Sequence, residues 1–295
     1  MKNIKWNFIE YIFVRAIMAF INFFPITIAT WIARRVGDIL FLALAGRRKT
    51  AIGNLNIAFG STKSNREKIR IALESFRNLT TSFMEFFRLP KFIKISEKHI
   101  RFQGAEHMDH AFARGKGFIL AMCHLGPWEY MGLISYQKKY HTAILGRPIK
   151  NPYFYEWIKS LRRMMGLYYI DKDTGPKAIF SRLKKNYGVG IAIDQWAGNY
   201  GLWIDFFGRP TSTTAIPAEF AKRTNCALIP AYFVRVSSGE YEMHIEPEIL
   251  PDKSDKNWVE NATKKLNHLL EEKIRAYPEQ WMWTHKRWKN KRHVI

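Results

Sequence analysis

Cysteine is scarce in this sequence, which has only two, Cys123 and Cys226, among 295 residues. Neither cysteine has further ligands at the spacing of a metal site, so the sequence predicts no metal centre. Each cysteine lies in or beside an apolar run, and we expect two buried free thiols in a reducing compartment. Neighbouring strand residues point to opposite faces, so Cys123 is not expected to act as a nucleophile paired with the next residue, His124.

Acidic residues are few as well. The chain has 25 Asp and Glu against 47 Lys and Arg, a formal net charge of +22 and a pI near 10.0. This balance predicts an anionic partner, which could be nucleic acid, an anionic membrane surface or an acidic protein. Aromatic residues make up 15% of the chain and include ten Trp. Because Trp is enriched where an apolar surface meets water, the composition favours an anionic membrane surface.

A long uninterrupted apolar run is also missing. Residues 16–33 carry no charge, but Asn22 and Pro25 interrupt them, and about 20 apolar residues are needed to cross a bilayer. No small-residue cleavage site of a signal peptide follows. We predict two hydrophobic helices that meet near Pro25 and form a membrane anchor, embedded in or lying on a bilayer, with their basic flanks on the cytoplasmic side. The alternative is a hydrophobic helical hairpin packed on the rest of the protein.

After this segment, the alternation of strand-like and helix-like patterns predicts an α/β fold with a mixed sheet covered by helices. Apolar runs of strand length alternate with amphipathic helical patterns, and a further strand pair is expected to turn at Ser238-Gly239. We therefore divide the chain into membrane-associating helices at 1–50 and an α/β domain at 51–295. The expected strands are 117–123, 142–145, 166–170, 188–193, 227–236 and 241–246, and the expected helices include 64–89, 151–165, 176–185, 215–223 and 258–276.

One apolar strand ends at a histidine. His124 follows the run 117–123, and Pro127 then suits the first turn of a helix, which would place Glu129 in that same turn. Glu129 could then accept a hydrogen bond from one ring nitrogen of His124, while the other nitrogen faces a substrate as a general base. The alternative is a histidine at the edge of the core and an ordinary first-turn glutamate.

Further candidate binding residues follow other predicted elements. Arg147 follows one strand and Asp194-Gln195 follows another, at the ends where ligands of α/β sheets bind. Arg162 lies on a predicted helix and is available to an anion. Arg287 belongs to a terminal run in which Trp alternates with basic residues, which suits a lipid interface or an anionic head group. Stacking on nucleobases is the competing use of that run.

These residues, in this order, resemble the lipid A biosynthesis acyltransferases, the lauroyl and myristoyl transferases of the lysophospholipid acyltransferase superfamily. The resemblance runs over nearly the whole chain. Its motifs are the N-terminal apolar segment, Asn54-Leu55 in an Arg-rich segment, His124 to Glu129, Arg147-Pro148, Asp194-Gln195, Phe206-Phe207-Gly208 and Pro278-Glu279-Gln280-Trp281-Met282-Trp283.

The resemblance implies transfer of a fatty acyl chain from a thioester, with acyl carrier protein as donor, to a hydroxyl of a lipid A precursor. His124 would be the general base and Glu129 would orient it, while Arg147 or backbone N–H groups after Pro127 would stabilise the oxyanion. Asp194 would contact the acceptor. No metal or cofactor is implied, and the expected location is the cytoplasmic face of the inner membrane of a Gram-negative bacterium.

Three alternatives remain at this point. A related enzyme could acylate another glycolipid, such as a phosphatidylinositol mannoside. A basic nucleic-acid-binding protein would also explain the charge and the aromatic residues, but not the N-terminal apolar segment, so the favoured interpretation has no nucleic acid among its partners. A membrane-surface scaffold without catalysis would tolerate loss of His124.

Overall fold

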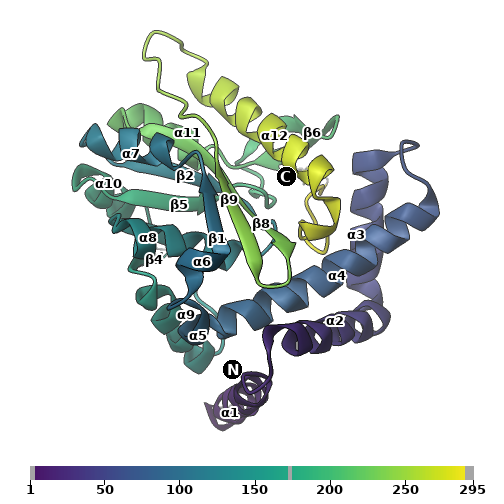
Figure 1. The fold of residues 1–295 in the computed structure, drawn as a ribbon. Coiled ribbons are helices and arrows are strands. Elements are labelled where there is room, and N and C mark those ends of the chain that lie inside the picture. Colours follow the sequence, from purple (N-terminus) through teal and green to yellow (C-terminus); the bar gives the residue numbers. More distant parts are fainter. Residues whose placement is uncertain (1–3, 172–174, 290–295) are drawn as a thin grey trace.

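The centre of the protein is a mixed seven-stranded sheet (Figure 1). The computed structural model describes residues 4–171 and 175–289, so the outer ends of both predicted units lie outside the described residues. Within these residues the strand order is β1-β9-β8-β2-β5-β3-β4, and only β8 and β9 pair antiparallel. The α/β fold and the mixed sheet are thus confirmed. The strands are β1 (Ile100–Gln103), β2 (Phe118–Met122), β3 (Thr142–Gly146), β4 (Leu167–Asp171), β5 (Gly188–Ala192), β8 (Ala227–Ser237) and β9 (Glu240–Ile245).

Helices cover both faces of this sheet. Strand β2 therefore contributes apolar side chains to two separate hydrophobic cores, one on each face. Phe118, Leu120 and Met122 join one core, while the alternate residues Ile119 and Ala121 join the other. A parallel strand buried on both faces needs such a continuous apolar run. The helices include α5 (Leu89–Phe92), α6 (Ser96–His99), α7 (Ala105–Ala113), α8 (Leu133–Lys138), α9 (Pro152–Met164), α10 (Gly175–Lys184), α11 (Ile216–Thr224) and α12 (Trp258–Ala276).

The N-terminal part consists of α1 (Ile4–Ile21) and α2 (Ile26–Ala43), which meet at Pro25 as predicted. They are followed by α3 (Ala45–Phe59) and the long α4 (Asn65–Phe87), which lies between α2 and the sheet (Figure 1). Gly37 of α2 lies so close to α4 that a Cβ there would come within 2.7 Å of the Arg77 Cα. The predicted boundary at residue 50 falls inside α3, so one helix belongs to both predicted units.

Among the described residues, no helix combines the length and the apolar character needed to cross a membrane. A membrane-spanning anchor is therefore not supported. Large apolar side chains are nevertheless exposed along both N-terminal helices and the turn between them. The most exposed are Ile4, Trp6, Ile9, Phe13, Phe20 and Phe23 before Pro25, and Trp31, Ile39 and Leu42 after it.

Three local features differ from the sequence-based expectations. The short edge strand β1 and the antiparallel pair β6 (Leu202–Phe206) and β7 (Arg209–Thr213) were not predicted. The segment after Pro127 begins as the 3₁₀ helix η1 (Trp128–Gly132) and continues into α8. In the Trp-rich terminus, Trp281 and Trp283 lie in the core beside the 3₁₀ helix η3 (Pro278–Gln280) and not at the surface.

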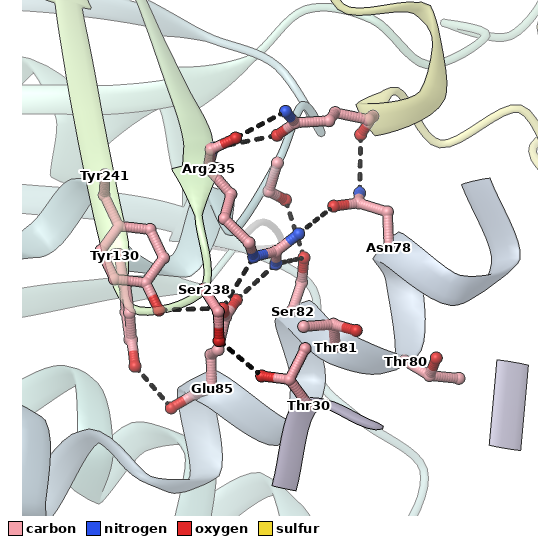
Figure 2. A network of polar contacts seen from close by, with 12 residues as sticks. Thr30, Asn78, Thr80, Thr81, Ser82, Glu85, Tyr130, Arg235, Ser238 and Tyr241 are labelled. Carbon is pink, nitrogen blue, oxygen red and sulfur yellow. Dashed lines mark hydrogen bonds and ion pairs between the residues drawn. The ribbon is translucent and has the colours of Figure 1, made fainter. Parts of the chain in front are cut away.

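A buried polar network joins α4 to the sheet (Figure 2). The Arg235 guanidinium, from β8, forms an ion pair with Glu85 and donates to Asn78 Oδ1 at 2.6 Å and to Ser82 Oγ at 3.1 Å. Tyr241 Oη donates to Glu85 Oε1 at 2.8 Å. Glu85 is 1% exposed, so a buried charge at this position requires these partners.

Glu85→Ala is expected to lower the free energy of unfolding by about 3–5 kcal/mol, because it leaves the Arg235 guanidinium buried without its counter-charge. Chemical denaturation of the purified protein measures this loss. Glu260→Ala is the matched control, because Glu260 pairs with Lys264 on the exposed surface of α12 and its loss should change stability little. Equal effects of the two substitutions would contradict the proposed importance of the network.

Candidate active site

A cavity of about 350 Å³ opens at the carboxyl ends of β2, β3 and β5. This edge of a parallel sheet is where α/β proteins bind ligands. The polar side chains that line the cavity come from α9 and from segments that follow four different strands, β2, β3, β5 and β7. They are His124, Glu129, Arg147, Arg162, Gln195 and Thr214, and the apolar lining includes Met122, Trp128, Ile144 and Trp196.

His124 is held from behind by Asp194. The ring Nδ1 lies 2.8 Å from Asp194 Oδ1, and the backbone N–H of His124 donates to Asp194 Oδ2 at 2.9 Å. Asp194 is only 2% exposed, and it accepts a third hydrogen bond from the indole Nε1 of Trp281 at 2.9 Å. With Nδ1 bound to the carboxylate, Nε2 is the ring nitrogen left for a ligand in the cavity.

His124 and Asp194 shift each other's pKa. Burial favours the neutral imidazole of His124, but the Asp194 charge and hydrogen bond outweigh it, so the pKa of His124 is raised above its ordinary value of 6.5. Burial raises the pKa of Asp194, yet His124 and the Trp281 indole lower it more, to about 2. Asp194 is therefore a fixed anion that stabilises a positive charge on His124.

Glu129 has a different partner from the one expected. Both of its oxygens accept from Arg162, at 3.0 Å from Nε and 2.7 Å from Nη2. The contact predicted between Glu129 and a ring nitrogen of His124 is thus replaced by the His124–Asp194 contact. Glu129 also lies on a 3₁₀ turn instead of the expected α-helix. Glu129 still lines the cavity and contributes to raising the pKa of His124 through its charge.

The other predicted site residues separate into two groups. Arg147 and Gln195 line the cavity beside Arg162, as expected of residues that contact substrate. Arg287 is fully buried, and its guanidinium donates to Ser212 O and Thr213 Oγ1, each at 2.7 Å. The expectation that Arg287 and Asp194 contact substrate does not fit these positions, since neither side chain lines the cavity.

Sequence reasoning included Arg287 and the Trp281 motif of the C-terminal segment but missed the contacts of this segment with Asp194 and with the loop that carries His124. Besides the Trp281 indole on Asp194, the Met282 N–H donates to His124 O at 3.1 Å and the Gly126 N–H donates to Gln280 O at 3.0 Å. Gly126 must be glycine here, because its φ is +55° and a Cβ would lie 2.4 Å from Phe233 O. One signal was present: His124 and Asp194 each follow an apolar run of strand length, and the carboxyl ends of parallel strands meet at one edge of a sheet.

The described residues contain no cluster of His, Cys, Asp or Glu that could hold a metal ion. Cys123 is buried beside the site, and burial raises the pKa of its thiol, so the reactive thiolate is disfavoured. The reactive group of the cavity is the His124 imidazole. Its Nε2 can accept a proton from a hydroxyl while the Asp194 carboxylate balances the positive charge that forms. Fold and site thus define an α/β protein whose cavity presents a histidine paired with a buried carboxylate.

Comparison with known proteins gives the family. The model of the bacterial lipid A biosynthesis acyltransferases matches residues 3–290. The chain belongs to this family, whose members are O-acyltransferases. The resemblance stated from sequence motifs is thereby confirmed.

Individual relatives are distant. A phosphatidylinositol mannoside acyltransferase of Mycobacterium tuberculosis is 26% identical over 214 residues, covering 69% of this chain and 66% of the relative. A lipid A biosynthesis acyltransferase of Haemophilus influenzae is 26% identical, covering 64% of this chain and 60% of the relative. The lipid A biosynthesis palmitoleoyltransferase of Escherichia coli is 24% identical and covers 90% of this chain and 87% of the relative. The chain thus spans about two thirds of the length of the first two relatives.

Asp194→Asn is expected to lower kcat/KM for the proposed acyl transfer about 10²- to 10⁴-fold and to move the acid limb of its pH profile to lower pH. The sign follows from the raised pKa of His124: the imidazole must be neutral to accept a proton, and removing the carboxylate charge lets it lose its own proton at lower pH. A pH series of initial rates measures both effects.

Asp205→Asn, an exposed carboxylate on β6, is the control and should leave the profile unchanged. If Glu129 set the protonation of His124, Glu129→Gln would move the acid limb and Asp194→Asn would not. That outcome would overturn the assignment of Asp194.

Proposed function

We propose that this protein transfers a fatty acyl chain from an acyl-thioester to a hydroxyl of a phosphorylated glycolipid, a lipid A precursor. The observation that supports it most directly is the His124–Asp194 pair on the wall of the 350 Å³ cavity. The donor we propose is acyl carrier protein, whose acidic surface complements the net charge of +22.

In the proposed reaction, His124 Nε2 removes the proton from the acceptor hydroxyl as its oxygen attacks the thioester carbonyl. The carbonyl becomes an oxyanion, and we assign its stabilisation to Arg147, which lines the cavity and has no ion pair among the described residues. Collapse of this intermediate breaks the carbon–sulfur bond and forms the ester. The departing thiolate takes the proton back from His124, which restores the neutral imidazole.

A narrow apolar cavity of about 30 Å³ adjoins the catalytic cavity, sharing Met122, Trp128, Glu129 and Ile144 with it. We propose that it receives the acyl chain. The cavity must widen to do so, and the flexible thioethers of Met108, Met122 and Met131 allow such movement. Gly188 and Gly190 of β5 form part of its wall, where any side chain would occupy the space.

The exposed apolar side chains of α1 and α2 support association with a membrane surface. Helices with such faces lie in the plane of the bilayer interface without crossing it. We propose attachment at the cytoplasmic face of the inner membrane of a Gram-negative bacterium, where a basic protein meets anionic lipids.

The acceptor has one alternative with specific support. The Mycobacterium tuberculosis relative is named a phosphatidylinositol mannoside acyltransferase, and it is as similar as the Haemophilus influenzae relative, named a lipid A biosynthesis acyltransferase. Nucleic-acid binding loses support, because the Trp281 and Trp283 side chains proposed for base stacking are buried.

Deletion of the gene is expected to remove one acyl chain from lipid A, as measured by mass spectrometry of extracted lipids. The wild-type gene should restore the chain, because the protein supplies the activity. His124→Ala should fail to restore it, because the base is lost. His110→Ala, an exposed histidine on α7, is the control and should restore it fully. Unchanged lipid A after deletion would refute this acceptor.

Gly190→Ala is expected to shift donor preference toward shorter acyl chains. A Cβ at this position would add a methyl group to the wall of the apolar cavity, 2.9 Å from Met122 Sδ, so Met122 must shift. Rates with a series of acyl donors of increasing length measure the preference. The control is Gly53→Ala in α3, where a Cβ meets no atom within 4 Å. An unchanged preference would place the acyl chain elsewhere.

A further inference from the structure

A second concave site lies beside the catalytic cavity, and we call it the basic groove. Its volume is about 620 Å³. Its walls come from the start of α3 and from the C-terminal segment, two parts of the chain that are far apart in sequence. The groove is lined by Leu44, Gly46, Arg47, Thr50, His285, Lys286 and Lys289.

Three cations converge on this groove without a counter-charge. Among the described residues, Arg47, Lys286 and Lys289 line it, and no carboxylate does. Within residues 4–171 and 175–289, none of the three forms an ion pair, whereas Arg77, Arg162 and other cations of this basic protein do. Uncompensated like charges in a concavity repel one another, so the groove favours an anion.

The groove is connected to the catalytic cavity through two residues. The backbone N–H of Trp196, which lines the cavity, donates to Nε2 of His285, which lines the groove, at 3.2 Å. Lys289 lies over the Trp196 ring at 4.3 Å from its centroid. Burial lowers the pKa of His285 to about 4, so its ring is neutral and carries its proton on Nδ1. A ligand in the groove is therefore a neighbour of a substrate at His124.

The groove also borders the exposed apolar surface. Leu44 lines the groove and is 43% exposed, and Leu42 at the end of α2 is 71% exposed. If the apolar faces of α1 and α2 rest on a bilayer, the cations of the groove lie at the level of lipid head groups.

We propose that the basic groove binds a phosphate group of a lipid head group, and that this phosphate belongs to the acyl acceptor. The site would hold the acceptor by its phosphate while a hydroxyl of the same molecule reaches His124. This inference rests on the proposed function for the identity of the acceptor. Binding of a lipid phosphate by the groove is a separate claim and can be tested without catalysis.

The test is the double variant Lys286→Gln/Lys289→Gln, assayed with a phosphorylated lipid A precursor and with the same acceptor after enzymatic removal of its phosphates. Both lysines are exposed, so the fold should be retained. We expect KM for the phosphorylated acceptor to rise about tenfold with kcat unchanged, a loss of about 1.4 kcal/mol of binding. With the dephosphorylated acceptor, wild type and variant should be equal.

The matched control is Lys184→Gln/Lys185→Gln, two exposed lysines that precede β5 and therefore lie at the opposite end of the strand from the cavity. This pair should leave both KM values unchanged. An equal rise of KM for both acceptors, or a rise of KM for the carrier-protein donor alone, would overturn the proposal.

A second measurement distinguishes the two sources of lipid phosphate and is independent of catalysis. Sedimentation with phosphatidylcholine vesicles containing phosphatidic acid reports binding of membrane phosphate. Weaker sedimentation of the double variant with unchanged acceptor KM would keep the groove as a phosphate site but overturn its assignment to the acceptor. No change in either measurement would overturn the phosphate site itself. If wild type transfers no acyl chain, the proposed function fails and the vesicle result alone decides on the groove.

Discussion

The buried carboxylate of Asp194 is the group on which the arrangement of the site depends. A carboxylate that is 2% exposed and ionised must be surrounded by donors, since an unpaired buried charge is costly. Its donors are the ring and the backbone of His124 and the indole of Trp281. Fixing that charge therefore fixes the tautomer of His124 and the position of the C-terminal segment at the same time.

Hydrogen bonds from helices α3 and α4 hold the C-terminal segment in place beside Asp194. Asn54 of α3 donates to the carbonyls of Trp283 and His285, and Asn78 of α4 donates to Gln280 O. The Arg235–Glu85 pair connects the same helix α4 to β8, which neighbours β2 in the sheet (Figure 2). Helices α3 and α4, the sheet and the C-terminal segment thus meet around the loop that carries His124.

The sequence predicted those features whose signal is local. The apolar run before His124 predicted β2, and the 3.6-residue pattern predicted α4 and α12, because burial imposes a period on such elements. The four residues of β1 are too few to show a period. Trp281 was expected at a surface but is buried. A run of Trp and basic residues has the same composition whether its Trp side chains are buried in a core or lie at a membrane interface.

Partners that are distant in sequence leave weaker signals. Nothing in the spacing of His124 and Glu129 excludes a contact between them, and the actual contact with Asp194 joins residues 70 positions apart. The same holds for Arg287, a charged residue that ordinarily lies in solvent but here donates to carbonyls inside the protein. The sequence identified most of the polar residues that line the cavity, but not which of them contact each other.

The indole hydrogen bond to Asp194 has a consequence for synthesis on the ribosome. Trp281 is added 87 residues after Asp194. At a translation rate of ~5–20 residues per second, the nascent chain exists for roughly 4–17 s with Asp194 present and its indole donor not yet made. During that interval water must hydrate the carboxylate, so the site closes only after the C-terminal segment has emerged.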